Sequence, residues 1–211
     1  MKKTLAVFFI LFAIITYKWA ILPALLSWGA TPEEFNSERA GDSWVPIRVW
    51  YKNTLAVTVH ASPTQVYPWL KQMGVGRGGF YSYTWLENMF GCDLHNADTI
   101  NNAWQQIDTG YYEPVCQSAY NNNQPGWIIA VINEPESFVY RGAGNSNWMM
   151  GFYVDSISPQ ECRLITRQQF KKPVKKAEYL LEVLWWNWAH CIMQHGVITG
   201  IKKRAEKQHL Y

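Results

Sequence analysis

His95 and Asp98 are the residues whose types and spacing come nearest to acid–base chemistry. Three positions apart, they fit on one turn of a helix, where an imidazole beside a carboxylate can move protons near neutral pH. No recognisable nucleophile accompanies them, so local capping by Asn96 and Asp98 is the competing interpretation. Glu87 is a second candidate acid or base.

The histidines and cysteines do not predict a metal centre. The other histidines lie far from His95 in the sequence, and no Cys-x-x-Cys or Cys/His cluster is present. We therefore expect neither a metal nor a cofactor. In an oxidising compartment the cysteines could form up to two bridges, with three possible pairings, and buried unpaired thiols are the alternative. They are Cys92, Cys116, Cys162 and Cys191.

A glycine cluster from Gly74 to Gly79 encloses one arginine, Arg77. The cluster matches G-x-G-x-x-G formally, but a dinucleotide fingerprint must follow a strand, and here an amphipathic helix is predicted before it. A nucleotide site is therefore not expected. The guanidinium of Arg77 could anchor a head group or an acid at a cavity mouth, or could be a structural clamp on Glu87 or Asp98.

Aromatic residues are dense, with 12 tryptophans and 12 tyrosines. Large rings suit cores, cavity walls and membrane interfaces. Tyr81 and Tyr83 could line a pocket or pack a core. Trp185, Trp186 and Trp188 fall on a predicted helix and cannot all face one way, so at least one should meet solvent, a cavity or a membrane surface.

The elements that must position these side chains follow from periodicity. Alternating apolar residues predict a strand over 53–60. Pro63, at a first helical position, opens a helix that the glycine cluster ends. A second helix is predicted over 81–90, and a polar segment over 93–106 follows it.

Two further pairs of strands and a long helix complete the pattern. An antiparallel sheet wrapped on one long helix would bury both apolar faces without parallel crossovers. The sequence therefore predicts an α+β fold. The strands are expected at 127–132, 137–141, 148–156 and 163–170, and the helix from 174 to about 208, with a bend near Gly196 or Gly200.

Residues 76–83, Gly-Arg-Gly-Gly-Phe-Tyr-Ser-Tyr, resemble the signature of a membrane-anchored branch of the START-like superfamily, also called the polyketide cyclase/dehydrase and lipid-transport or SRPBCC superfamily. Gly-Ala-Thr-Pro-Glu-Glu at 29–34 and the His-x-Ala-Asp pattern at 95–98 are similar to the same branch. The likeness runs from about Gly29 to the end and is densest over 67–105. It implies a helix-grip (START/Bet v 1-like) fold, with a curved antiparallel sheet around the C-terminal helix.

The resemblance further implies a domain over 52–211, a lead-in over 29–51 and an internal cavity for a small hydrophobic or amphipathic ligand, either a lipid or an apolar metabolite. Binding without catalysis is the preferred interpretation. The alternatives are an enzyme of the cyclase or hydratase type with His95 or Glu87 as acid/base, and an envelope interaction protein without a ligand. The candidate ligand-binding residues are Arg77, Tyr81, Tyr83, Glu87, His95, Asp98 and Trp185.

Residues 1–28 are predicted to form a membrane anchor. Two lysines precede apolar runs, and a helix from Thr4 to Leu22 would be about 28 Å long, close to the thickness of a hydrocarbon core. The lysines before it and the acidic residues after it predict a cytoplasmic N-terminus and an exported domain. A cleaved signal peptide, giving a secreted or periplasmic protein, is the alternative, although Trp28 occupies a place where cleavage after Ala30 wants a small residue.

The expected partners are therefore the lipid bilayer and a small apolar ligand. The formal net charge of +3 is mild, and no strip of interleaved basic and aromatic residues is present, so nucleic acid is not an expected partner. The sequence leaves the oligomeric state open.

Overall fold

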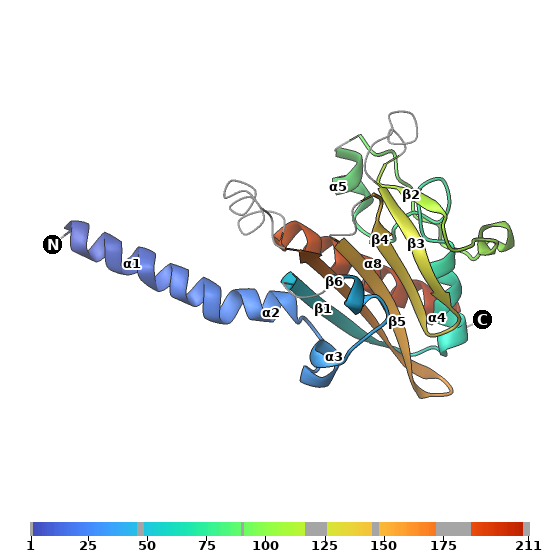
Figure 1. Cartoon of the computed structure of the whole chain (residues 1–211), viewed down its shortest axis with the longest axis horizontal. Helices are drawn as coiled ribbons and strands as arrows, with labels where there is room; N and C mark the ends of the chain where they lie inside the picture. Colours follow the sequence, from blue (N-terminus) through green and yellow to red (C-terminus); the bar gives the residue numbers. More distant parts are fainter. Residues whose placement is uncertain are drawn as a thin grey trace.

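One antiparallel sheet carries the fold, with its strands in the order β1-β6-β5-β4-β3-β2 (Figure 1). The computed structural model describes residues 2–45, 49–89, 91–116, 126–144, 148–171 and 187–208. The last strand returns beside the first, so β1 pairs with β6. The strands are β1 (Val49–Val59), β2 (Tyr112–Pro114), β3 (Gly126–Asn133), β4 (Ser137–Gly142), β5 (Trp148–Ser158) and β6 (Glu161–Lys171).

Helices α4 (Pro63–Lys71) and α8 (Asn187–Gln208) cover one face of the sheet, called the inner face here (Figure 1). Inward residues alternate along the strands and pack against α4, as where Tyr67 meets the ring of Phe138. This arrangement confirms the predicted α+β fold with an antiparallel sheet on a C-terminal helix, which is the helix-grip layout.

The boundaries agree with the predictions within about two residues except at four places. The first strand was predicted from residue 53 but begins at Val49. The short strand β2 was not predicted, because three residues carry no usable alternation. Residues 174–186, where the long helix was expected to begin, lie outside the described residues. The helix predicted over 81–90 is shorter: α5 spans Thr84–Met89, because the backbone of Tyr81 is left-handed with φ of 58°.

Gly196 and Gly200 lie within the continuous helix α8 and serve close packing. A Cβ on Gly196 would lie 2.7 Å from Ser82 Oγ and 2.8 Å from the Tyr83 ring. A Cβ on Gly200 would overlap the carbonyl oxygen of Tyr81. The two glycines therefore let the segment before α5 approach the helix backbone.

The N-terminal helical segment projects from the sheet (Figure 1). It consists of α1 (Lys2–Thr16), the π-helical turn η1 (Tyr17–Ile21) and α2 (Leu22–Leu26), with right-handed helical backbone at both junctions. The helix predicted from Thr4 to Leu22 is thus divided by η1. No helix in the described ranges combines the length and the apolar character needed to cross a membrane.

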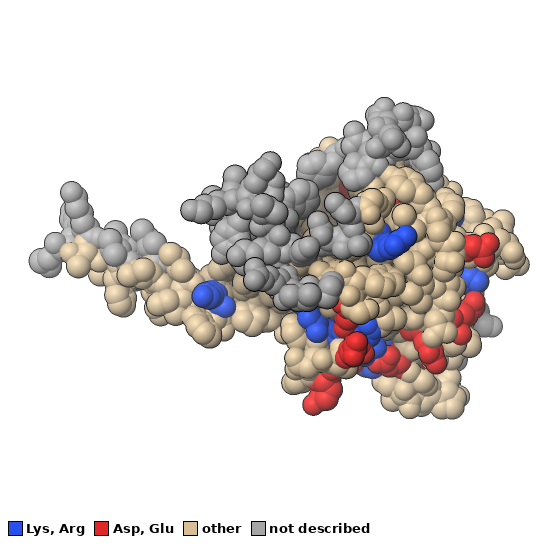
Figure 2. Space-filling view, in the orientation of Figure 1, with Lys and Arg blue, Asp and Glu red and all other residues tan. Residues whose placement is uncertain are grey.

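The surface of this projecting segment is apolar. Phe8, Phe9 and Phe12 are at least 60% exposed, and several aliphatic side chains beside them are more than half exposed. Figure 2 shows most of the charged side chains of the face in view on the sheet-and-helix body, with one basic side chain on the projecting segment.

Ring contacts hold the projecting segment and the turn that follows it to α8. The indole Nε1 of Trp188 donates to the hydroxyl of Tyr17 at 2.9 Å, and their rings stack with centroids 5.9 Å apart. The ring of Trp28 meets the imidazole of His195 edge-on at 4.2 Å. The base of the segment is therefore fixed beside the first half of α8.

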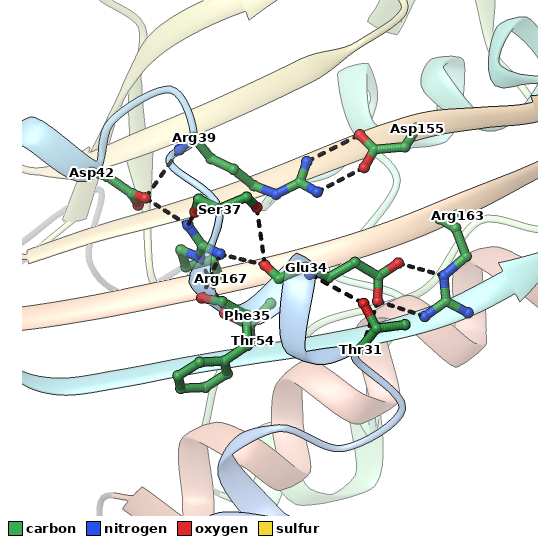
Figure 3. Close-up of polar contacts among 10 residues, drawn as sticks. All are labelled: Thr31, Glu34, Phe35, Ser37, Arg39, Asp42, Thr54, Asp155, Arg163 and Arg167. Carbon is green, nitrogen blue, oxygen red and sulfur yellow. Dashed lines mark hydrogen bonds and ion pairs between the residues drawn. The ribbon is translucent and has the colours of Figure 1, made fainter.

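Residues 29–45, called the lead-in segment here, lie against the outer face of the sheet (Figure 3). Helix α3 (Pro32–Asn36) begins with a capping box, in which Thr31 Oγ1 accepts from the Glu34 N–H at 3.2 Å and Glu34 Oε2 accepts from the Thr31 N–H at 2.8 Å. Pro32 occupies the first helical position, where a proline is well tolerated.

Arg167 of β6 fixes the lead-in segment to the sheet (Figure 3). Its side chain is fully buried on the outer face and donates to the carboxylate of Asp42 at 2.5 Å and to Thr54 Oγ1 at 3.0 Å. It also donates to the backbone carbonyls of Glu34, Phe35 and Ser37 at 2.6, 3.0 and 2.7 Å. A buried guanidinium with this many acceptors strongly favours the docked segment.

Two further ion pairs flank Arg167 (Figure 3). Arg163 donates to both carboxylate oxygens of Glu34, at 2.7 and 2.9 Å. Arg39 makes a bidentate pair with Asp155, at 3.0 and 2.7 Å. The residues predicted to be a lead-in are thus docked along their described length.

Candidate functional site

The glycine cluster forms a loop that closes on itself. Gly74 and Gly79 exchange two backbone hydrogen bonds, at 2.9 and 3.0 Å, and both have positive φ. A Cβ on Gly79 would lie 2.5 Å from Asn96 Oδ1 and from the carbonyl oxygen of His95. The glycines are therefore required by backbone geometry, and they bring the loop against residues 95 and 96.

Arg77 is a structural clamp inside this loop. Its Nη2 forms a close ion pair with Glu113 Oε2, and its Nη1 donates to the carbonyl of Lys71 at 3.0 Å. The ring of Tyr111 lies against the guanidinium, 5.1 Å from centroid to Cζ. Only 11% of the Arg77 side chain is exposed, so little of the cation is presented to a ligand.

Glu113 reaches Arg77 from β2 and is fully buried. Its other oxygen accepts from the N–H of Val75 at 2.8 Å. Burial raises the pKa of Glu113 to about 7, while Arg77 and the Val75 N–H oppose that rise. The predicted partners of Arg77, Glu87 and Asp98, were wrong, because β2 places a nearer carboxylate against the loop.

Tyr81 is buried and organises the turn between the loop and α5. Its N–H donates to Asn96 Oδ1 at 2.7 Å, and its hydroxyl accepts from Gln72 Nε2 at 2.8 Å. Burial raises the pKa of Tyr81 to about 12, so the hydroxyl is neutral. The guanidinium of Arg204 covers its ring at 5.1 Å. These contacts make Tyr81 a packing residue of the loop.

The predicted pairing of His95 with Asp98 is wrong. Both lie in an irregular segment rather than on a helical turn, because Asn96 is drawn toward Tyr81. His95 approaches Asp93 at 3.2 Å, and Asp98 pairs with Arg204 at 2.9 Å. The side chains of His95 and Asp98 are 83% and 80% exposed, an environment that does not favour acid–base chemistry.

Glu87 and Tyr83 have different surroundings. The Glu87 Oε2 atom has no hydrogen-bond partner among the described residues, and burial raises the pKa of this carboxyl to about 7. The Tyr83 hydroxyl lies 3.2 Å from Nδ1 of His195 on α8. A carboxyl that titrates near neutrality is a usable acid or base, so that role of Glu87 stays a prediction.

Two hollows formed by described residues lie away from α8. One of about 460 Å³ lies between the lead-in segment and β5, beside Arg39 and Tyr153. Another of about 250 Å³ lies over β3, beside Trp44 and Arg141. None of the described candidate residues lines either hollow, and Trp185 lies outside the described residues.

The inner face carries polar residues that were not among the predicted site residues. Strand pairing aligns Asn53 with Gln168, Gln168 with Met150, and Met150 with Tyr140, across β1, β6, β5 and β4. From α8, Gln194 Nε2 donates to Gln168 Oε1 at 2.7 Å. These five residues, called the inner row here, are all buried.

Hydrogen bonds satisfy the β1 end of the inner row. Asn53 Oδ1 accepts from the Gln168 N–H at 2.9 Å, and Asn53 Nδ2 donates to the Tyr51 hydroxyl at 2.9 Å. That hydroxyl lies 3.1 Å from Cys191 Sγ. Burial raises the pKa of Cys191, so its thiol is neutral and packs as a small side chain.

Other buried groups of the inner face, in and beside the inner row, have no hydrogen-bond partner among the described residues. The hydroxyl of Tyr140 and Oε1 of Gln194 have no hydrogen-bond partner in the described part of the chain, and neither has the hydroxyl of Thr166, two residues before Gln168. All three side chains are at least 97% buried. An unmet buried group costs about 1–3 kcal/mol and is uncommon. Three on one face are typical of a polar site that a ligand or ordered water fills.

Aromatic rings border the inner row at Tyr140, on β4. Trp127 lies edge-on to Tyr140 at 5.9 Å and stacks on Trp148 at 5.5 Å. Phe170 continues the series and stacks on His190 of α8 at 5.2 Å. Burial lowers the pKa of His190 to about 4, so this imidazole is neutral at pH 7. Apolar rings and the neutral His190 thus border the inner row, while the Arg77–Glu113 ion pair acts electrostatically on Tyr140.

The structure contains both a disulfide and buried unpaired thiols, the two alternatives that the sequence left open for the cysteines. Cys92 and Cys116 form a disulfide that ties the segment after α5 to the segment after β2. Cys162 and Cys191 are free and buried.

Comparisons with known proteins show distant structural likeness. The sequence matches no protein-family model and no curated protein. A Thermobifida fusca protein solved by NMR is 11% identical over 74% of this chain and 93% of its own, with a TM-score of 0.46. An Aha1 dimer from Colwellia psychrerythraea is 12% identical over 70% and 97%, with a TM-score of 0.35. An HSP90 activator from Plasmodium falciparum is 10% identical over 67% and 92%, with a TM-score of 0.36.

Proposed function

We propose that this chain is a membrane-held domain of the START-like type that binds a small apolar or amphipathic ligand without catalysis. The ligand would lie between the inner face of the sheet and α8. The observation that carries the proposal is that the buried polar atoms of Tyr140, Thr166 and Gln194 have no partner among the described residues. They lie on the inner face, among apolar and aromatic side chains. Ligand sites commonly combine an apolar lining with a few polar groups that orient the guest.

The membrane part of the proposal is supported by the projecting segment. Its exposed phenylalanines would otherwise leave a large apolar surface in water. With two lysines before it, the N-terminus would be cytoplasmic and the domain exported. The Cys92–Cys116 bridge supports an oxidising compartment for the domain.

Native mass spectrometry of the full chain, purified in mild detergent from its own membrane fraction, tests the proposal. We expect a bound species that organic extraction releases and identifies, and an unbound mass after delipidation. A chain that fractionates with soluble proteins would contradict the membrane assignment. A single unliganded mass from several independent preparations would contradict ligand binding.

A further inference from the structure

The hydrogen bonds of the inner row restrict the chemistry of its guest. One N–H of the Gln194 side-chain amide donates to Gln168 Oε1 at 2.7 Å. The remaining Gln194 Oε1 can only accept a hydrogen bond. A guest that satisfies this atom must therefore bring a donor, either an O–H or an N–H.

The hydroxyls of Tyr140 and Thr166 are two further groups without a partner among the described residues. They do not change the need for a donor at Gln194 Oε1. Each can donate or accept, since a hydroxyl rotates to suit its partner. Burial raises the pKa of Tyr140 well above its usual value, so it stays a neutral phenol. Each of these hydroxyls could therefore accept from a ligand or donate to it.

Charge excludes other head groups. Among the described residues, the guanidinium of Arg77 is occupied by Glu113, and Arg163 and Arg167 are engaged with the lead-in segment on the outer face. Arg77 and Glu113 act electrostatically on Tyr140 but compensate each other, so none of these arginines is left without a counter-ion to receive an anionic head group. A charged group placed there without a partner would lose far more hydration than hydrogen bonds restore.

We propose that the ligand is a neutral amphipath, an apolar body that carries a hydroxyl or amide N–H donated to Gln194 Oε1. This inference rests on the proposed function and adds the class of ligand. The apolar body would lie along the rings of Trp148 and Phe170, toward the first turns of α8. Trp188 joins that end of α8 to Tyr17 of the projecting segment, so the site lies near the part of the chain proposed to contact lipid.

The test compares three probes of equal chain length, 1-dodecanol, dodecane and dodecanoate, with the full chain in lipid nanodiscs. Displacement of the co-purified species, followed by native mass spectrometry, gives the relative affinities. We expect 1-dodecanol to bind more tightly than dodecane by about tenfold, the value of one buried hydrogen bond. Dodecanoate at pH 8 should bind no better than dodecane.

Matched variants assign the effect to the named atoms. Gln194→Leu should remove the preference for the alcohol and leave dodecane binding unchanged, whereas Gln208→Leu, on the exposed end of the same helix, should change neither. Thr166→Val and Tyr140→Phe keep side-chain volume and remove only the unsatisfied hydroxyls. If Gln194→Leu does not fold, these two variants replace it in the test. At least one of them should reduce the preference for 1-dodecanol over dodecane severalfold.

The outcomes separate this inference from the proposed function. Tighter binding of dodecanoate, or equal binding of alcohol and alkane in every variant, would overturn the neutral-donor class while leaving ligand binding intact. A structure with saturating 1-dodecanol that shows only ordered water at Gln194 would also overturn it. If no probe binds and no species is extracted, the proposed function itself fails.

Discussion

Arg77 and Glu113 lie 36 positions apart in the sequence and form a close ion pair that joins the glycine loop to β2. The carboxylate is fully buried, and the guanidinium is almost so. Loss of one partner leaves the other buried without compensation, which costs more than the pair contributes.

The first prediction concerns this pair. Arg77→Met should lower the free energy of unfolding by about 1–3 kcal/mol, because Glu113 and the carbonyl of Lys71 lose a buried hydrogen-bond partner. The double variant Arg77→Met/Glu113→Gln should recover a measurable part of the loss. Urea denaturation followed by tryptophan fluorescence measures both. Arg141→Met, at an exposed strand end, is the control, and an equal loss there would contradict this account.

The second prediction concerns the lead-in segment. Arg167→Met removes four hydrogen bonds that hold residues 29–45 on the sheet, and a fifth to Thr54 of β1. Limited proteolysis should then cleave the lead-in segment before the sheet, at least tenfold faster than in the unmodified chain, since local opening would cost less free energy. Glu33→Gln is the matched control at an exposed position of the same segment. Unchanged cleavage in Arg167→Met would refute the clamp.

The third prediction concerns Gly200, where replacement by alanine should destabilise the protein rather than stabilise its helix. Alanine normally stabilises a helix relative to glycine by about 0.5–1 kcal/mol. Gly200→Ala should instead lower the free energy of unfolding by about 2 kcal/mol, because its Cβ overlaps the carbonyl oxygen of Tyr81. Thermal unfolding monitored by circular dichroism measures the change, with Lys203→Ala on the exposed side of α8 as the control. A stabilised Gly200→Ala protein would mean that Tyr81 is not packed against the helix.

The fourth prediction concerns pH. Because burial raises the pKa of Glu87 to about 7, the folded state holds its proton more tightly than the unfolded state, whose pKa is near 4.5. This carboxyl therefore lowers stability progressively as pH rises from about 4.5 to about 7, and no further above that. Glu87→Gln should be increasingly more stable than the unmodified chain over this interval. Denaturant titrations at several pH values measure the difference, and Glu38→Gln, exposed, should show none.

The sequence predicted the sheet and the helices that cover it because each carries a regular apolar period. It also contained a signal for the inner row that was not used. Asn53 falls in the inward phase of Leu55 and Val57, and Gln168 in that of Leu164. A polar residue at an inward position of a strand predicts a buried hydrogen-bonded group, and here it marks the candidate site.

Other features were beyond the reach of periodicity. Glu113 lies on a strand of three residues, so nothing local distinguishes it from a surface carboxylate. The left-handed backbone of Tyr81 depends on Asn96, fifteen positions later, and shortens the helix predicted from residue 81. Such contacts depend on which segments meet in space. The partners of Arg77 and His95 were therefore assigned wrongly from neighbours in the sequence.

The chain leaves no slack between its projecting segment and its sheet. Tyr17 and Trp28 hold that segment and the turn that follows it to α8, and Arg167 holds the lead-in segment to the opposite side of the sheet. A tether gripped on both sides sets orientation rather than reach. Residues 2–26 are therefore expected to leave the domain in a defined direction, beside the first turns of α8.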